Sequence, residues 1–430
     1  MTKRRFQRWK KSQWVAFGIW AAMACTYFLL YWMQGVTYNN ADYKFHNPSV
    51  QWLLEDGAFT GYPGYQIVVG AVALLLGGVD SIGVASVIVL MTCALAAGYV
   101  TFLLLRECIG TSGSDRPGLS DWQNTALLGI AFLINIVQPI FTPSIKPGYI
   151  SGNGYVSPTQ LLCKPFALLV MLIFLRQLLR NKWTIRQQLL LLGMLALSCL
   201  AKPVFAMAFV PAAGLLLAFI EFRTFLAKKQ TLPQAIGHTL RKGWPLLAGG
   251  VVLIVQYLLC LQVDLPYDGF MGIDGDAKIA FGWMTAWSQV VSSVPLNILF
   301  AYFFPLVTSM MAFARRKQNL GLSSTPRLYG AICLFYGVIS FLYMSCLYQE
   351  NHVTDANLRN AWVLTFNFVF ILSASTVWQW INLDGFSLRS LRQEGVLPTF
   401  RKHWTILVPA AAFAVHILFG LALIAKNYLA

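Results

Sequence analysis

The sequence predicts an all-α membrane protein with about eleven transmembrane helices. Apolar runs of about 20 residues recur along the chain, and a helix of that length crosses the ~30 Å hydrocarbon core of a bilayer. Lysine and arginine collect in every second gap between these runs, and basic loops stay in the cytoplasm. The other gaps therefore form an outer face, which carries Asp42, Asp264, Asp268, Asp274, Asp276, Glu350 and Asp355.

The composition supports this fold class. Of 430 residues, 57% are hydrophobic and only 11% are charged, whereas soluble proteins carry about 25% charged residues. The net charge of +16 comes from basic residues in short loops, which set topology and bind anionic lipid. The partner they indicate is the lipid bilayer, and nucleic-acid binding is excluded. We expect one polytopic domain over residues 1–430, without a separate soluble domain.

The first predicted span, residues 13–33, follows a basic N-terminal segment. The basic flank places the N-terminus in the cytoplasm, and the lack of a small-residue cleavage site makes the span a signal anchor. The other ten predicted spans are residues 82–105, 125–141, 160–179, 186–200, 204–220, 244–263, 290–313, 328–347, 362–381 and 404–424.

One shorter apolar stretch, residues 65–79, is left over. Counting it as a span would place most later basic clusters outside, whereas a helix lying on the outer surface keeps every one of them inside. Its length is also short for a crossing. We therefore predict a first outer loop over residues 34–81 that contains interfacial helices.

Asp42 is the candidate catalytic residue. It lies shortly after the first span, in a polar segment that also contains Lys44 and His46. A carboxylate held near the membrane surface can act as a general base. The alternative is a solvated loop aspartate that pairs with Lys44.

Two lysines stand at the outer ends of predicted spans, and each precedes a proline. Lys164 lies one turn inside its span, and Lys202 ends another. A lysine in hydrocarbon costs ~2.5–3.5 kcal/mol, so it usually has a partner or a function. The two Lys-Pro pairs suggest a site for an anionic headgroup, and snorkelling to the interface is the alternative.

Two outer loops supply candidate sugar contacts. The loop 349–362 has the densest polar cluster, and its acids and amides suit sugar hydroxyls, while an arginine before the next span can contact a phosphate. The glycine-rich loop 148–159 presents tyrosines that either stack on sugars or join an aromatic belt. The candidate substrate-binding residues are Glu350, His352, Asp355, Asn357, Asn153 and Tyr155, and the candidate phosphate-binding arginine is Arg359.

The layout and local motifs resemble the GT-C class of glycosyltransferases. The aminoarabinose transferases and protein O-mannosyltransferases share the basic N-terminus, one span, and a long outer loop with an early acid and interfacial helices. The chain also reads P-G-Y-Q at 63–66, N-G-Y-V-S-P-T at 153–159 and K-P-F-A at 164–167, which are similar to motifs of bacterial GT-C-like proteins. Gln66 and Val156 stand where that group has histidine.

The resemblance implies a multi-pass enzyme of the bacterial inner membrane. It would move a sugar from a polyprenyl-linked donor to a glycan or glycolipid acceptor on the outer leaflet. Asp42 would deprotonate the acceptor, and Lys164, Lys202 and Arg359 would hold the donor phosphate. The polar residues of loops 148–159 and 349–362 would orient substrate. No metal motif or cofactor site is evident, so basic residues are expected at the phosphate.

Two other functions remain open. An O-antigen or capsule polymerase joins lipid-linked oligosaccharides, but it would favour several arginines in a large outer loop, and Arg359 is the one found there. A non-enzymatic lipid or solute transporter would need polar residues deep in several spans, where Asn367 and His416 are the main candidates.

Overall fold

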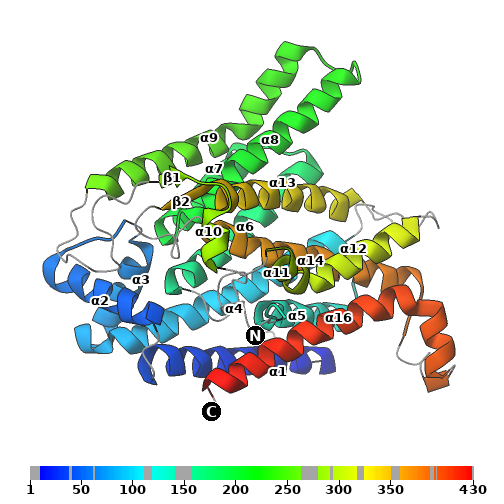
Figure 1. The fold of residues 1–430 in the computed structure, drawn as a ribbon, viewed down its shortest axis with the longest axis horizontal. Coiled ribbons are helices and arrows are strands. Elements are labelled where there is room, and N and C mark those ends of the chain that lie inside the picture. Colours follow the sequence, from blue (N-terminus) through cyan, green and yellow to red (C-terminus); the bar gives the residue numbers. More distant parts are fainter. Residues whose placement is uncertain are drawn as a thin grey trace, which may run out of the picture.

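The structure is a computed structural model and confirms an all-α membrane protein (Figure 1). It describes residues 10–37, 41–61, 63–110, 119–140, 157–262, 279–290, 294–316, 324–349, 359–387, 392–393 and 395–428. Among these residues, eight helices are long and apolar enough to cross a membrane. They belong to α1 (Lys11–Trp32), α4 (Ile82–Ile109), α6 (Pro158–Arg180), α8 (Val204–Leu226), α9 (Leu232–Gln262), α13 (Ser324–Cys346), α14 (Arg359–Leu383) and α16 (Val396–Tyr428).

The three other predicted spans correspond to shorter helices. Residues 125–141 overlap α5 (Asp121–Ile136), and residues 186–200 match α7 (Ile185–Ala201). The prediction of one continuous helix over residues 290–313 is wrong, because that region divides into α11 (Val294–Ala301) and α12 (Phe303–Arg316), and the separate short helix α10 (Thr285–Val290) ends where the predicted span begins. Pro295 and Pro305 lie in the first turns of α11 and α12, where proline is tolerated, whereas in one long helix they would be interior. The count of eleven crossings stays a prediction.

Two long helices begin earlier than the apolar pattern indicated. Helix α9 starts twelve residues before the predicted span, so that α8 and α9 form a hairpin that projects from the rest of the molecule (Figure 1). Helix α16 starts at Val396, and its backbone bends at His403. Both additions are amphipathic or polar segments, which continue as helix beyond the apolar runs.

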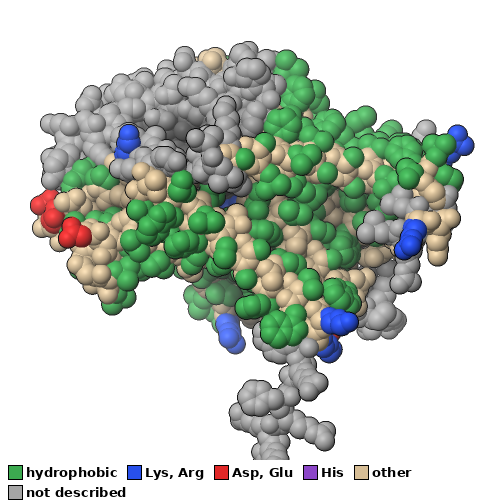
Figure 2. Space-filling view, turned by 90° about the horizontal axis from the view of Figure 1, so that it is seen from below, with side chains coloured by type: hydrophobic (Ala, Val, Ile, Leu, Met, Phe, Trp, Pro, Cys, Tyr) green, Lys and Arg blue, Asp and Glu red, His purple; other side chains and the backbone are tan. Residues whose placement is uncertain are grey.

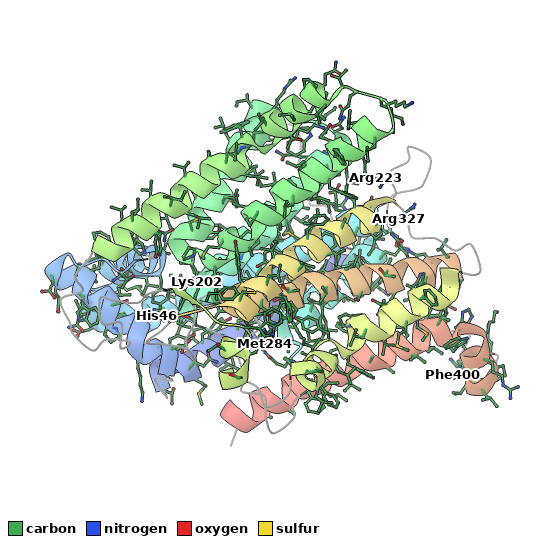
Figure 3. The ribbon with its side chains drawn as sticks, turned by 45° about the horizontal axis from the view of Figure 1, so that its top comes forward. His46, Lys202, Arg223, Met284, Arg327 and Phe400 are labelled. Carbon is green, nitrogen blue, oxygen red and sulfur yellow. The ribbon has the colours of Figure 1, made fainter. Side chains whose placement is uncertain are left out.

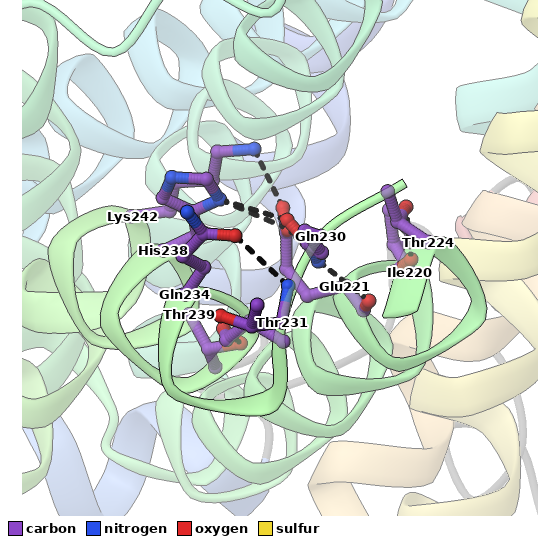
Figure 4. A network of polar contacts seen from close by, with 10 residues as sticks. Ile220, Glu221, Thr224, Gln230, Thr231, Gln234, His238, Thr239 and Lys242 are labelled. Carbon is purple, nitrogen blue, oxygen red and sulfur yellow. Dashed lines mark hydrogen bonds and ion pairs between the residues drawn. The ribbon is translucent and has the colours of Figure 1, made fainter. Parts of the chain in front are cut away.

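The α8–α9 turn is fastened by a polar network around Glu221 (Figure 4). Its carboxylate is largely buried and accepts from Lys242 Nζ at 2.7 Å and from Gln230 Nε2 at 3.1 Å. Gln230 also donates to the Glu221 carbonyl, and its Oε1 lies 3.1 Å from His238 Nδ1. A buried carboxylate needs such partners, so this network stabilises the hairpin.

The centre of the bundle is made by α4, α6, α8 and α14. Most of α6 and α14 is buried, whereas α1 and α9 expose most of their apolar residues. On α9, Val251, Ile254 and Leu258 are each more than half exposed. Figure 2 shows broad hydrophobic areas on one face, with lysine and arginine at its edges. Such a surface suits lipid contact.

Long-range contacts assign helix termini to two opposite ends. At the end where α1 begins, Lys10 pairs with Asp121, and Arg315 pairs with Asp384. At the other end, Gln256 Nε2 donates to the carbonyls of Gly61 and Cys199. We call these the basic end and the opposite end. The opposite end contains the described part of residues 34–81, the predicted first outer loop.

The predicted first outer loop folds into two helices. They are α2 (Ala41–Asp56) and α3 (Gly64–Leu76), followed by the short turn η2 (Val79–Ser81). Helix α3 has 13 residues, about 20 Å of helix, which is shorter than the hydrocarbon core. Helix α2 buries Tyr43, His46 and Val50 along one face. We call α2 and α3 the cap.

Two other outer segments pair as strands. β1 (Ile279–Phe281) runs antiparallel to β2 (Leu347–Gln349), with Ala280 opposite Tyr348. Met284 continues this contact, because its backbone N–H donates to the Ser345 carbonyl at 2.6 Å. The pairing brings the segment before α10 beside the end of α13, at the opposite end of the bundle.

Candidate functional site

The cap packs directly on the ends of α6 and α7. A side chain at Gly64 would place its Cβ 2.7 Å from the Leu200 carbonyl oxygen, so only glycine permits this close approach. Gln256 of α9 bridges the Gly61 and Cys199 carbonyls. The cap is therefore fixed to the transmembrane bundle.

His46 of α2 is the central buried group under the cap. Its imidazole is 7% exposed, and Nε2 lies 2.9 Å from Ser157 Oγ at the start of α6. Ser157 Oγ in turn lies 2.8 Å from Thr159 Oγ1. Burial, and then the positive charge of Lys202, lower the pKa of His46 to about 3. At neutral pH the imidazole is therefore uncharged, able to donate one hydrogen bond and accept another.

Lys164 and Lys202 are both buried at this end, with 4% and 3% of their surfaces exposed. Lys202 lies in the turn between α7 and α8, as the sequence predicts, and is labelled beside His46 in Figure 3. Its backbone carbonyl accepts a hydrogen bond from Cys163 Sγ at 3.5 Å, and Cys163 directly precedes Lys164. Both lysines have further polar or electrostatic interactions within the protein. The two lysines thus lie on contacting segments, and the charge of Lys202 acts on the neutral His46.

Tyr65 joins three helices beside His46. Its hydroxyl donates to Asn47 Oδ1 at 2.9 Å and lies 2.6 Å from Ser86 Oγ of α4. Its ring meets the His46 ring edge to face at 5.8 Å. Burial raises the pKa of Tyr65, so the phenol stays protonated. These contacts fix the orientation of the imidazole.

Gln66 has a structural role in this chain. Its Nε2 donates to the Ser49 carbonyl at 2.6 Å, and its Oε1 accepts from the backbone N–H and hydroxyl of Thr60. The amide therefore ties α3 to α2 and to the loop between them. Glutamine therefore stands where the resemblance suggests histidine, and its amide does not titrate. The neighbouring residue Tyr65 contacts the imidazole of His46.

Asp42 lies in the first turn of α2 and is exposed. It precedes His46 by four residues, so both stand on one side of the helix, with Asp42 one turn closer to the N-terminus. A carboxylate in the first turn is favoured by the helix dipole. Asp42 is thus placed at the solvent-exposed edge of the cap.

The remaining predicted site residues lie beyond the described side chains. Arg359 is the first residue of α14, and the structure describes its backbone but not its side chain. The predicted convergence of Lys164, Lys202 and Arg359 within about 10 Å therefore stays a prediction. The other predicted substrate-binding residues lie outside the described residues, and they are Asn153, Tyr155, Glu350, His352, Asp355 and Asn357.

The sequence interpretation did not select His46 or Ser157. A local signal for α2 was present, because Tyr43, His46 and Val50 repeat with helical spacing. Nothing local links His46 to Ser157, which is 111 residues away.

No protein-family model matches this sequence, and no curated protein matches it significantly. Within the described part of the chain, no group of three or more His, Cys, Asp or Glu side chains is placed to hold a metal ion. Functional interpretation therefore depends on the chemistry of the residues under the cap.

Proposed function

We propose that this protein is a membrane glycosyltransferase that uses a polyprenyl-linked sugar donor at its outer face. The observation that carries the proposal is the pair of buried lysines, Lys164 and Lys202, on contacting segments beneath the cap. Two buried lysines attract an anion strongly in a low-dielectric environment, because the anion offsets the cost of burying their charge, and a lipid phosphate is available at this depth.

The proposed reaction is a substitution at the anomeric carbon of the donor sugar. The acceptor hydroxyl oxygen bonds to this carbon, and its proton passes to the Asp42 carboxylate. The bond between the carbon and the phosphate oxygen breaks, and its electron pair stays on the phosphate. Lys164 and Lys202 stabilise that developing negative charge, in the manner of an oxyanion site. Arg359 adds a third cation if it reaches the phosphate.

The neutral state of His46 fits this arrangement. A protonated imidazole would be repelled by the charge of Lys202, whereas a neutral one can hydrogen-bond a sugar hydroxyl or Ser157. We assign His46 a positioning role, because its side chain is buried on the inner face of α2, while Asp42 of the same helix is exposed. Glu350, His352, Asp355, Asn357, Asn153 and Tyr155 remain proposed contacts to sugar or acceptor.

The donor-site test uses farnesyl phosphate, a short lipid phosphate, with the purified chain in detergent. Lys202→Met should weaken binding about 10- to 100-fold, because a hydrogen bond to a charged group contributes ~1.5–3 kcal/mol. Lys202→Arg should retain part of the affinity. Lys44→Met removes an exposed lysine of the same cap and should change nothing. Equal losses in the Lys44 and Lys202 variants would remove the phosphate site from the proposal.

The catalytic test measures release of polyprenyl phosphate from radiolabelled polyprenyl-phosphate monosaccharides in liposomes. Asp42→Asn should lower the rate by ~10²–10⁴-fold, since the amide cannot accept the proton. Asp80→Asn, an exposed acid beyond α3, is the matched control. Near-normal turnover in Asp42→Asn would return Asp42 to an ordinary surface residue. Transfer of oligosaccharide blocks alone would favour the polymerase, and uptake without donor cleavage would favour a transporter.

The proposal also requires the cap to face outward. A cysteine at Asp80 should react with an impermeant thiol reagent added to intact cells, and one at Gln230, in the α8–α9 turn, should not. The reverse pattern would place the cap in the cytoplasm and exclude a donor of the outer leaflet.

A further inference from the structure

A second polar site lies at the basic end of the bundle, opposite the cap. A cavity of about 550 Å³ opens between α4, α6 and the start of α13. Three arginines line it, Arg106 from α4 and Arg176 and Arg180 from α6, together with one acid, Glu107. The cavity wall also includes Leu103, Leu179 and Thr325.

The charges in this cavity do not cancel. Glu107 is 17% exposed and accepts from Arg176 Nε at 2.7 Å, while Arg180 Nη2 is 3.7 Å away. One carboxylate thus shares the cavity with three guanidinium groups, which leaves a formal surplus of two positive charges. The Glu107 contact uses Nε of Arg176 and orients its guanidinium. Arginine forks match the geometry of phosphate oxygens.

Ordinary topology signals explain basic residues at helix ends but not this convergence. Arginine near a helix C-terminus is favoured by the dipole, and each of these residues would be stable alone in water. Here two helices direct three of them to one concave site that also has leucines in its wall. A phosphate headgroup on an acyl chain has this combination of charge and apolar surface. Arg327 and Arg223 lie at the same end (Figure 3).

We propose that this cavity binds a phosphate group, supplied by the headgroup of an anionic phospholipid in the cytoplasmic leaflet. Basic pockets between transmembrane helices on that side are suited to anionic headgroups. The apolar wall favours a lipid over a soluble phosphate. This site is independent of the proposed transfer reaction, because it lies at the other end of the bundle.

The test uses the full chain, purified and delipidated in detergent, with lipid binding followed by native mass spectrometry. Palmitoyl-oleoyl phosphatidylglycerol should bind more tightly than the phosphatidylcholine of the same chains. Arg106→Gln and Arg176→Gln should each weaken phosphatidylglycerol binding about fivefold, the equivalent of ~1 kcal/mol per charge. Arg106→Gln leaves the Arg176–Glu107 pair intact, so it retains the fold-stabilising contact.

Arg223→Gln is the control, since Arg223 lies at the same end but outside the cavity wall. An equal loss in Arg223→Gln, or equal binding of the two lipids, would overturn the site. Glycerol 1-phosphate, which has no acyl chain, tests whether a soluble phosphate binds the cavity. If it binds as tightly as phosphatidylglycerol and displaces it, the lipid assignment is overturned and the phosphate comes from solution.

Discussion

Acid should loosen the cap through His46. The pKa of this imidazole is about 3 in the folded protein, against 6.5 for an exposed one. Between these values the unfolded state binds a proton that the folded state does not, so stability falls as the pH drops below 6.5. At pH 5 the imidazole contributes a penalty of about 2 kcal/mol, taking 1.36 kcal/mol per pH unit.

The perturbation is His46→Gln, which keeps an amide for Ser157 but does not titrate. Hydrogen exchange of α2 backbone amides should be measured at pH 7.5 and pH 5, with correction for intrinsic rates. In the wild type, acid should raise the opening equilibrium of α2 about 30-fold, which corresponds to ~2 kcal/mol. His46→Gln should abolish that increase.

The matched control is His238→Gln, which removes an exposed imidazole from the α8–α9 hairpin. It should leave the acid response of α2 as in the wild type. Acid-induced opening of equal size in wild type and His46→Gln would refute the reasoning, because the penalty would then come from another group. The charge that faces His46 from α7–α8 is Lys202, but burial is the larger cause of the lowered pKa, so Lys202→Met should leave most of the acid response in place.

Two further changes test the packing that positions the site. Asp384→Ala should lower the free energy of unfolding in detergent by ~3–5 kcal/mol, because the Arg315 side chain is 3% exposed and both its Nη atoms donate to that carboxylate. Replacing Arg315 by Met and Asp384 by Leu together should recover most of the lost stability. An Asp384→Ala variant as stable as the wild type would show that the pair is not needed. Gly64→Ala should lower the melting temperature and raise exchange in α3, since its Cβ would meet the Leu200 carbonyl at 2.7 Å. Gly18→Ala, with open space around it, is the control, and equal melting temperatures would contradict the close cap contact.

Most of the helical plan follows from local properties of the sequence. Apolar length identifies α1, α4, α6, α8, α13 and α14 because a membrane helix must satisfy its backbone internally along its own segment. The turn at Lys202 and Pro203 is also local, since proline cannot continue α7. The sequence also signals the division of residues 290–313 through Pro295 and Pro305, but the high hydrophobicity of the whole stretch favoured its interpretation as one span.

The sequence by itself determined that the chain is an apolar helical bundle, where its basic residues cluster, and that two lysines stand at the ends of helices. Only the tertiary structure decided that α2 packs on α6, that His46 meets Ser157 and the charge of Lys202, and that three arginines line one cavity at the basic end. The physical reason is range. Helix formation depends on neighbours three or four residues apart, which leave a periodic pattern, whereas a contact such as His46 to Ser157 depends on how separate helices pack.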